Sequence, residues 1–448
     1  HRGKCIGDMK GGTQNVLDAC SSFHLDGHVV PLTDEHRDAI LRQMREYSGE
    51  SLRVIALAYR DFPADQTRFP LSDTERDFVF AGLVGMLDPP REGVRDAVAE
   101  VRGAHVRVFM LTGDGPITAA AIAGRIGMPV DKVLTGEDLR QMSEEELLNA
   151  LSTQCLVLSR VSPREKYRVV TLLKSLGEVV AVTGDGVNDT LSLKSADIGV
   201  AMGEQGSDVA KEAAEIVLTD DDFTTLVIAV KEGRTIFQNL KNVVLSSITS
   251  NIGELSCVCA GFVGAAVGLP IPITAVQILS IDLIGEMLPL MALTFDPAER
   301  DLMQQEPRKL GTHIIDRMRL LELAFFGVLM GLGGYFSFYM VQATGGTAAM
   351  AQAGSFLGII LVQYMNILCR RSAGSVFSRH LFSNKPLLLA LAFSFAMVAA
   401  ITGNPDIGSW FGFEALRPQD WTWPVIAALA FLLCMEAKKF AWRRTALR

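Results

Sequence analysis

The sequence predicts an α/β domain followed by an all-α domain of six membrane-spanning helices. Two observations carry this prediction: residues 1–240 are polar and alternate β-rich with amphipathic runs, whereas long apolar stretches recur from residue 243 onward. The charge agrees with this division, because the net −8 of the chain comes from the front half and the back half is slightly basic. The composition, 49% hydrophobic and 21% charged, excludes a single soluble domain, a disordered chain and a collagen-like chain.

The acidic front half and the cysteines exclude further classes of protein. There is no basic stripe to release counterions from phosphates, so we expect no nucleic-acid partner. Seven cysteines without a Cys-x-x-Cys pair predict neither a zinc site nor a secreted disulfide framework. The chain begins with His1 and shows no signal peptide, which predicts a partial sequence.

The α/β prediction rests on the stretch between residues 78 and 219. Apolar β-rich runs predict strands at 78–86, 106–111, 155–159, 178–183 and 198–202. Amphipathic segments predict helices near 92–102, 116–127, 163–175 and 206–214. Strands that alternate with helices form a parallel sheet with right-handed crossovers, and such sheets bind ligands beyond the carboxyl ends of their strands.

Residues of the same types, glycine and aspartate with a further polar side chain, follow two of these predicted strands. One strand runs into Thr112, Gly113 and Asp114, and another runs into a turn with Asp185, Asn188 and Asp189. Small residues let backbone N–H groups approach a phosphate, threonine adds a hydroxyl donor, and carboxylates hold Mg²⁺. The alternative is that each aspartate serves only a turn or a helix N-cap.

A lysine lies between these two turns in the sequence. Lys166 opens the predicted helix that follows Pro163, where its charge can offset the charge that develops on a transferring phosphoryl group. The two turns and this lysine together predict a site that handles phosphate with Mg²⁺.

Residues 1–75 predict part of a second α/β unit, on the basis of Lys10, the two following glycines and the β-rich run 52–60. Lys10 and Arg53 can contact a nucleotide there. The alternative is that both are solvated surface charges.

The all-α prediction rests on six apolar stretches, each near the 20 or so residues that a membrane-spanning helix needs. They are 243–266, 274–295, 320–342, 349–369, 386–403 and 421–441. A long helix from about residue 223 is expected to run into the first of them.

Basic residues in the loops predict the orientation of these helices. They cluster at 300–319, 370–385 and 438–448, all on the side of the acidic front half, and the opposite side has only Arg417. Because basic loops stay inside, we expect a multi-pass protein whose front half and C-terminus are cytoplasmic.

Polar side chains inside the apolar stretches predict a cation site in the lipid bilayer. Helical spacing places Asn251 with Glu254 on one face and Asp282 with Glu286 on another, and Gln363 and Asn366 lie in the fourth stretch. Carboxylates at membrane depth are costly and usually face an ion path, and oxygen ligands suit Na⁺, K⁺, Ca²⁺ or H⁺. The alternative is that these residues join helices by hydrogen bonds or lie near the interface.

One of these stretches also contains residues that weaken a helix. Gly285 and Pro289 flank Glu286, and a weakened helix there frees carbonyl oxygens that can coordinate a cation.

Together these motifs resemble the P-type ATPases, cation pumps that pass through an aspartyl-phosphate. The segments that carry the resemblance are TGDGVNDTLSLKSADIGVAMG (183–203), MLDPPR (86–91), MLTGD (110–114), Arg164–Glu165–Lys166, SNIGE (250–254) and IDLIGEMLP (281–289). The resemblance implies that residues 1–75 end a nucleotide-binding domain. It also implies a haloacid-dehalogenase-like phosphorylation domain at 76–222, and a stalk with membrane helices five to ten at 223–448.

The resemblance assigns roles to individual residues. Asp185 would hold Mg²⁺, supported by Asn188 and Asp189; Thr112, Gly113 and Asp114 would contact the phosphoryl group and Lys166 would stabilise its charge. Lys10 and Arg53 would contact ATP. The cation ligands would be Asn251, Glu254, Asp282, Glu286, Gln363 and Asn366.

Within the family the sequence is most similar to the class of calcium pumps and sodium/potassium pumps. Its features are mixed between the two, so the transported ion stays open among Na⁺, K⁺ and Ca²⁺. Two departures stand out: Gly12, Thr13 and Gln14 replace the usual Ala-Pro-Glu, and Gly285 replaces a threonine.

The family's aspartyl nucleophile, in a DKTGT motif, is absent from the sequence. The resemblance therefore implies the C-terminal half of an ATP-driven cation pump, inactive without the half that supplies this aspartate. Two alternatives stay open: a haloacid-dehalogenase-type phosphatase on a membrane anchor, and a non-catalytic or split subunit that needs a partner half.

Overall fold

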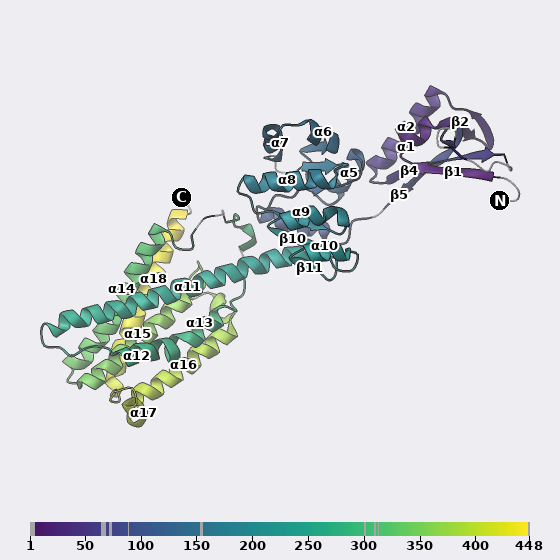
Figure 1. Cartoon of the computed structure of the whole chain (residues 1–448). Helices are drawn as coiled ribbons and strands as arrows, with labels where there is room; N and C mark the ends of the chain where they lie inside the picture. The colour runs from purple at the N-terminus through teal and green to yellow at the C-terminus, as the bar shows by residue number, and fades with distance from the viewer. Residues whose placement is uncertain are drawn as a thin grey trace. The chain divides into compact units, whose positions relative to one another are not determined.

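The computed structural model describes residues 5–63, 69–70, 74–87, 89–152, 156–299, 302–308, 311 and 313–446. Among the sequence features named above, Asp88, Arg300, Lys309 and Arg448 lie outside the described residues. The chain divides into two compact units, one of residues 1–228 with 303–310 and one of residues 229–302 with 311–448 (Figure 1).

The first unit begins with a five-stranded sheet. Its strands are β1 (Cys5–Gly11), β2 (Cys20–Leu25), β3 (His28–Pro31), β4 (Arg53–Phe62) and β5 (Phe78–Met86), in the order β1-β4-β5-β2-β3. Helices α1 (Thr13–Asp18) and α2 (Asp34–Gly49) pack on one face of the sheet. That face holds the core, in which Val16, Leu17 and Ala56 are almost completely buried.

One predicted strand belongs to a different sheet from the one expected. Residues 78–86 do form a strand, but β5 pairs antiparallel with β4 and parallel with β2. The prediction that 78–86 opens the second, parallel sheet is therefore wrong, and the first sheet extends past residue 75. Strand pairing is a long-range contact, which the local β pattern of 78–86 does not report.

The rest of the first unit contains two three-stranded sheets, and every strand pair in them is parallel, as predicted. One sheet has β7 (Lys132–Thr135), β8 (Leu156–Ser159) and β6 (Met110–Leu111); the other has β9 (Ala181–Gly184), β10 (Ile198–Met202) and β11 (Ile216–Leu218). The connecting helices are α4 (Val94–Gly103), α5 (Pro116–Arg125), α6 (Gly136–Gln141), α7 (Glu144–Leu151), α8 (Pro163–Ser175), α9 (Thr190–Ser195) and α10 (Asp208–Ala213).

The sequence-based prediction missed two strands of these sheets and made a third strand too long. β7 and β11 have four and three residues, too few for a periodic signal. In the run 106–111 only Met110 and Leu111 pair with a neighbouring strand.

A buried carboxylate fixes the loop that follows β10. Asp221 accepts hydrogen bonds from the backbone N–H groups of Gly203 (2.5 Å), Glu204 (3.0 Å) and Gln205 (2.8 Å). Burial alone would raise the pKa of Asp221, but these three donors and the nearby Arg91 guanidinium hold it below its usual value. The Arg91 guanidinium also donates to the carbonyl oxygen of Asp221, at 2.5 Å.

We expect Asp221→Ala to speed hydrogen exchange at the amides of Glu204 and Gln205 by about tenfold or more, because these donors lose their acceptor. The Gly203 N–H keeps a second acceptor, the carbonyl oxygen of Leu218 at 2.8 Å. Because the folded-state pKa is depressed, protection in the wild type should be complete above the unfolded pKa and decline as the pH falls through the folded pKa. Glu212→Ala, an exposed acid on α10, is the control and should leave these amides unchanged. Unaltered exchange in Asp221→Ala would contradict the assignment.

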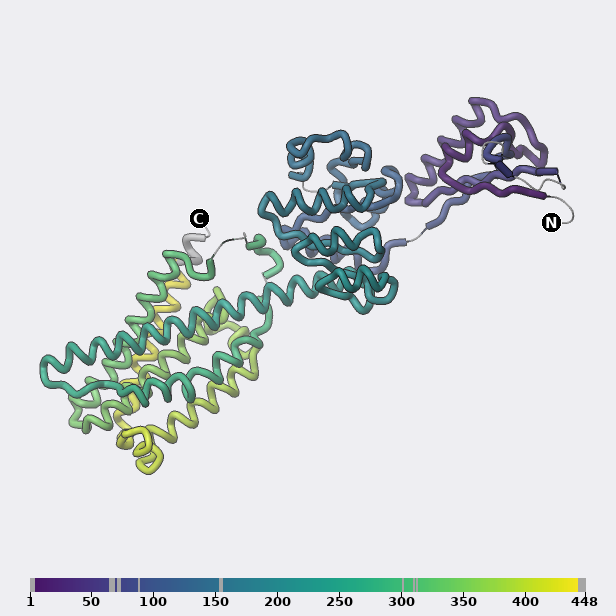
Figure 2. The backbone as a smooth tube through the Cα atoms, in the orientation of Figure 1, coloured from purple at the N-terminus to yellow at the C-terminus, as the bar shows by residue number. Residues whose placement is uncertain are grey.

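The second unit is a helical domain. Its elements are α11 (Phe223–Ala265, which begins in the first unit), α12 (Ala275–Ser280), the π-helical segment η2 (Ile281–Glu286), α13 (Met287–Leu293), α14 (Arg317–Ala343), α15 (Ala348–Arg370), α16 (Lys385–Gly403), α17 (Pro405–Ser409) and α18 (Thr422–Ala446). α11 has 43 residues, which confirms the prediction of a long helix from residue 223, and its backbone runs without a break (Figure 2). α15 is the most buried of the long helices.

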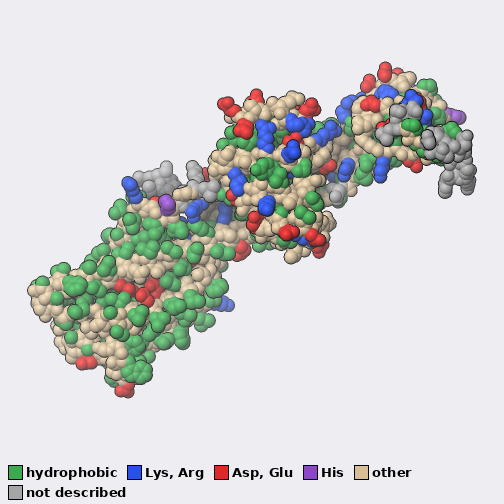
Figure 3. Space-filling view, in the orientation of Figure 1, with side chains coloured by type: hydrophobic (Ala, Val, Ile, Leu, Met, Phe, Trp, Pro, Cys, Tyr) green, Lys and Arg blue, Asp and Glu red, His purple; other side chains and the backbone are tan. Residues whose placement is uncertain are grey.

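Five helices among the described residues are long and apolar enough to cross a membrane: α11, the segment 275–293, α14, α15 and α16. Hydrophobic side chains cover most of the visible surface of this domain (Figure 3). The sixth predicted span forms α18 but is not among the five. Its C-terminal half carries Glu436, Lys438 and Lys439, which shorten the apolar stretch.

Glycines allow α11 and α14 to touch through their backbones. A Cβ at Gly331 of α14 would strike the carbonyl oxygen of Gly253 on α11, and a Cβ at Gly327 would strike Ile252. A Cβ at Gly334 would lie 2.5 Å from a side-chain carbon of Ile359 on α15. Small residues at helix contacts are typical of membrane bundles.

A buried ion pair and its hydrogen bonds join the ends of α13, α15 and α16 to the middle of α11. Asp296, just beyond α13, lies 2.8 Å from the guanidinium of Arg371, just beyond α15, and both side chains are 2% exposed. Asn384, the N-cap of α16, donates to Asp296 Oδ1 at 2.9 Å, and Asn239 of α11 donates to the Asp296 carbonyl oxygen at 2.7 Å. Arg371 also donates to the carbonyl oxygens of residues 380 and 381.

Candidate functional site

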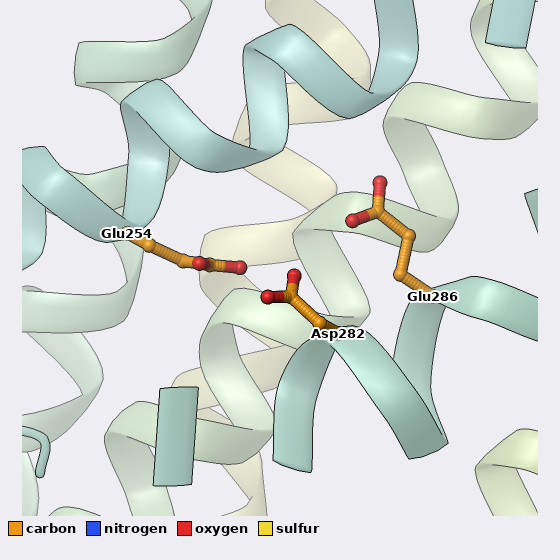
Figure 4. A group of neighbouring side chains, drawn as sticks. All are labelled: Glu254, Asp282 and Glu286. Carbon is orange, nitrogen blue, oxygen red and sulfur yellow. The ribbon is translucent and has the colours of Figure 1, made fainter. Parts of the chain in front are cut away.

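Three carboxylates from two helical segments meet inside the helical domain. Glu254 comes from α11, and Asp282 and Glu286 come from η2 (Figure 4). One oxygen from each of the three lies within 4.8 Å of the others. Glu254 and Glu286 are 5% and 3% exposed, and Asp282 is half-buried.

Polar neighbours orient two of these carboxylates. The Ser250 hydroxyl donates to Glu286 Oε1 at 2.6 Å, and the Gln363 Nε2 group donates to Glu254 Oε1 at 3.1 Å. Gln363 is fully buried, and its Oε1 atom has no hydrogen-bond partner among the described residues. An unpartnered amide oxygen on a side chain that contacts Glu254 is a further candidate hard ligand.

The wide helical turn at Ile281–Glu286 places two of the three acids. Pro289 has no N–H, so the carbonyl oxygen of Gly285 loses its α-helical partner, and the chain adopts a π-helical segment there. A Cβ at Gly285 would lie 3.0 Å from a side-chain carbon of Ile360 on α15, so glycine lets η2 pack close to that helix. The helix is irregular at the place where the sequence predicted weakness.

Charge dominates the chemistry of this cluster. No lysine, arginine or histidine in the described part of the chain forms an ion pair with Glu254, Asp282 or Glu286. Three carboxylates this close repel one another unless protons or a bound cation offset their charge. The arrangement therefore suits a hard cation with oxygen ligands.

The structure does not bring all six predicted cation ligands together. Asn251 is exposed in the described part of the chain, and its neighbour Ser250 is fully buried and contacts Glu286. The structure therefore does not bring Asn251 into the cluster, and its role as a cation ligand stays a prediction. Both residues lie within 60° or so of Glu254 around the helix, and helical spacing alone does not decide which one its neighbours cover. Asn366 is fully buried, but its Oδ1 atom accepts a hydrogen bond from Arg370 at 2.9 Å.

The two phosphate-type turns of the α/β domain are linked through α8. Thr112 hydrogen-bonds within its turn, with its Oγ1 atom accepting from the Asp114 N–H and donating to Asp114 Oδ2. The backbone around Thr112 and Asp114 bonds to residues 158–161, directly before α8. From the first turn of α8 the Lys166 Nζ atom reaches Asp189 Oδ1 at 2.7 Å.

The second turn keeps one carboxylate exposed. A Cβ at Gly184 would lie 2.5 Å from Asp189 Cβ, so only glycine lets the Asp189 side chain fold back toward Lys166. Asp185 and Asn188 are exposed, as is Gly113 of the first turn. Asp189 is already paired, which leaves Asp185 as the available carboxylate of this turn.

Lys10 and Arg53 lie on the same, open face of the first sheet. Lys10 of β1 pairs with Leu57 of β4, and Arg53 of β4 pairs with Met86 of β5. Leu57, Val84 and Met86 on this face are 37%, 43% and 43% exposed. The sequence reasoning missed these apolar residues. Leu57 alternates with the buried Ala56 and Ala58, a period-two signal that pointed to it, whereas Val84 and Met86 have no buried neighbours along β5.

Comparison with known proteins gives consistent matches along the chain. Residues 270–441 match the family described as cation transporting ATPase, C-terminus, and residues 1–93 match P-type ATPase, cytoplasmic domain N. The chain is 32% identical to a sodium/potassium-transporting ATPase subunit alpha of Tetronarce californica, over 97% of this chain and 49% of that protein.

Two calcium-transporting ATPases match equally broadly. Calcium-transporting ATPase 1 of Bacillus cereus is 34% identical over 96% of this chain and 50% of its own length. An endoplasmic reticulum calcium ATPase of Aspergillus fumigatus is 35% identical over 97% of this chain and 49% of its own length. The chain thus spans about half the length of these relatives. The family matches, the relatives and the apolar helices all point to the same family of membrane proteins. The chain is a multi-pass integral membrane protein that belongs to the P-type ATPases.

Proposed function

We propose that this chain is part of a pump that uses ATP to move Na⁺, K⁺ or Ca²⁺ across a membrane through an aspartyl-phosphate intermediate. One observation carries the proposal: Glu254, Asp282 and Glu286 converge within 4.8 Å inside a bundle of membrane helices. Buried carboxylates with no cationic side chain beside them are the natural ligands of a transported cation.

The proposal gives each part of the first unit a role. The open sheet face with Lys10 and Arg53 binds ATP, because it offers exposed apolar side chains for the base and two cations for the phosphates. The parallel sheets form the haloacid-dehalogenase-like phosphorylation domain. Its phosphoryl site comprises Thr112, Gly113, Asp114, Lys166, Asp185, Asn188 and Asp189.

The residues at the end of β9 fit Mg²⁺. Asp185 offers an exposed, hard carboxylate ligand, and Asp189 of the same turn is paired with Lys166 of α8. Bound there, Mg²⁺ would offset phosphate charge. Lys166 holds Asp189 in place and adds a positive charge on the phosphoryl side.

The acceptor aspartate of the proposed reaction is not among these 448 residues, because the sequence has no DKTGT motif. We propose that it lies in the other half of the pump, which corresponds to the part of the relatives that this chain does not match. The α/β domain and the C-terminus then lie in the cytoplasm, and α18 forms a sixth span whose charged end reaches that side.

The test is ATP hydrolysis by membranes that contain this chain together with the half that supplies the acceptor aspartate, titrated separately with Na⁺, K⁺ and Ca²⁺. We expect one of these ions to stimulate turnover. Glu254→Gln and Asp282→Asn should each raise the ion concentration for half-maximal activity by about 10- to 100-fold, because a charged ligand is lost.

Asp406→Asn, an exposed acid in the same domain, is the matched control and should leave the titration unchanged. If no ion stimulates turnover and neither site substitution alters it, the protein does not transport these cations.

A further inference from the structure

A hydrogen-bonded pair of side chains lies on the open face of the first sheet. Tyr59 Oη of β4 and His24 Nε2 of β2 are 2.7 Å apart, and the ring centroids are 5.8 Å apart. Along β4, Leu57 pairs with Lys10 of β1, and Tyr59 pairs with Asp8 of the same strand. Residues two apart on a strand share a face, so Tyr59 and Lys10 lie on the same side of the sheet.

A bare place in this face lies beside the pair. Gly82 of β5 pairs with Leu57, in the row of the face next to that of Tyr59. Apart from the two chain neighbours of Gly82, no described atom lies within 4 Å of where a Cβ on this residue would stand. Leu57 and Val84 beside it are 37% and 43% exposed. A flat base can lie here on uncovered backbone and apolar side chains.

The charges on this face set the direction of a bound nucleotide. Asp8 pairs with Tyr59, Asp61 is two residues farther along β4, and both acids are exposed. Arg53 lies in the opposite direction, four residues before Leu57, about 13 Å along the strand. Phosphates are attracted to Arg53 and repelled by the two carboxylates, so the base of the nucleotide lies toward Tyr59.

The bond to His24 makes the Tyr59 hydroxyl an acceptor. An imidazole nitrogen is a stronger base than a phenol oxygen, so Tyr59 Oη donates its proton to His24 Nε2. Within the described residues Tyr59 Oη has no other hydrogen-bond partner, so its lone pairs are available. Adenine has a donor at position 6 of the base, its amino group, whereas guanine and hypoxanthine have a carbonyl oxygen there.

We propose that Tyr59 makes the nucleotide site specific for adenine, because its Oη accepts a hydrogen bond from the 6-amino group. His24 is the positioning residue that occupies the hydroxyl proton. A base with a carbonyl oxygen at position 6 brings two acceptors together and is bound less tightly. This inference rests on the proposed function, because it names the part of ATP that the open sheet face recognises.

The experiment compares ATP with inosine triphosphate, whose base has a carbonyl oxygen in place of the 6-amino group. The measurement is equilibrium binding of each ³H-labelled nucleotide, without Mg²⁺, to this chain together with the half that supplies the acceptor aspartate. The wild type should bind ATP about tenfold or more tightly than inosine triphosphate. Tyr59→Phe, which removes only the hydroxyl, should bring the ratio of the two affinities close to one.

Two variants of His24 test its positioning role. His24→Ala frees the Tyr59 hydroxyl proton to turn toward the base, so inosine triphosphate should bind about threefold or more tightly than it does to the wild type. His24→Glu, whose carboxylate only accepts, should keep the preference for ATP. Loss of a merely structural histidine would not improve the binding of inosine triphosphate. Tyr167→Phe, which alters an exposed tyrosine of α8, is the matched control and should keep the wild-type ratio.

The outcomes separate the inference from the proposed function. If the wild type binds both nucleotides equally, or if Tyr59→Phe keeps the full preference for ATP, the inference fails while ATP binding at this face stands. If neither Lys10→Ala nor Arg53→Ala weakens nucleotide binding, the proposed ATP site fails and the inference fails with it. The wild-type ratio does not depend on whether any variant folds.

Discussion

Replacing Asp185 with asparagine should lower the phosphoenzyme level more than about 100-fold, since it removes the charged ligand proposed for Mg²⁺. Asp185 is the exposed carboxylate of its turn, whereas Asp189 is already paired with Lys166. The measurement is acid-stable ³²P label from γ-³²P-labelled ATP on membranes that contain this chain together with the half that supplies the acceptor aspartate. Release of the label by hydroxylamine identifies it as an acyl phosphate.

Asp96→Asn is the matched control, because Asp96 is an exposed aspartate of α4 away from both turns. It should label like the wild type. Equal labelling of Asp185→Asn and the wild type would remove Asp185 from the metal site, whereas cation binding in the helical domain would be unaffected.

Asp296→Ala should destabilise the helical domain by about 3–5 kcal/mol, because it leaves the guanidinium of Arg371 buried without its charge partner. The measurement is thermal unfolding of the purified protein in detergent. Asp406→Ala, which removes an exposed acid from the same domain, should change the midpoint little.

Removing both charges of the ion pair together makes this test sharper. A double variant with Asp296→Leu and Arg371→Met should be more stable than either single variant, because no unpaired charge stays buried. If the two single losses simply add, the pair is not coupled and the assignment of this ion pair as a joint between helix ends is wrong.

Local sequence patterns were sufficient to predict much of the helical domain. Length and apolarity located α14, α15 and α16 within a few residues, because a span needs a fixed number of apolar residues whatever it packs against. Asp282 and Glu286 are four residues apart, which predicts that both acids lie on one face of a helix, and the structure places them together. Glycine and proline beside Glu286 signalled the irregular turn.

What the sequence did not reveal depends on contacts between distant residues. Whether Ser250 or Asn251 is covered is decided by the packing of η2, which periodicity along α11 does not encode. The strand β5 carries an ordinary β pattern, and only its pairing with β4 and β2 assigns it to the first sheet. The bond from Arg370 to Asn366 had a usable signal, since residues four apart on a helix are neighbours.

The backbone contact between α11 and α14 limits how this bundle can change shape. Because Gly331 lies directly on the carbonyl oxygen of Gly253, the two helices have no spare room to slide or roll against each other. We expect them to move together in any rearrangement of the bundle. The π-helical turn at Ile281–Glu286 lies outside this contact, so Asp282 and Glu286 can shift relative to Glu254, which stands on the closely packed pair.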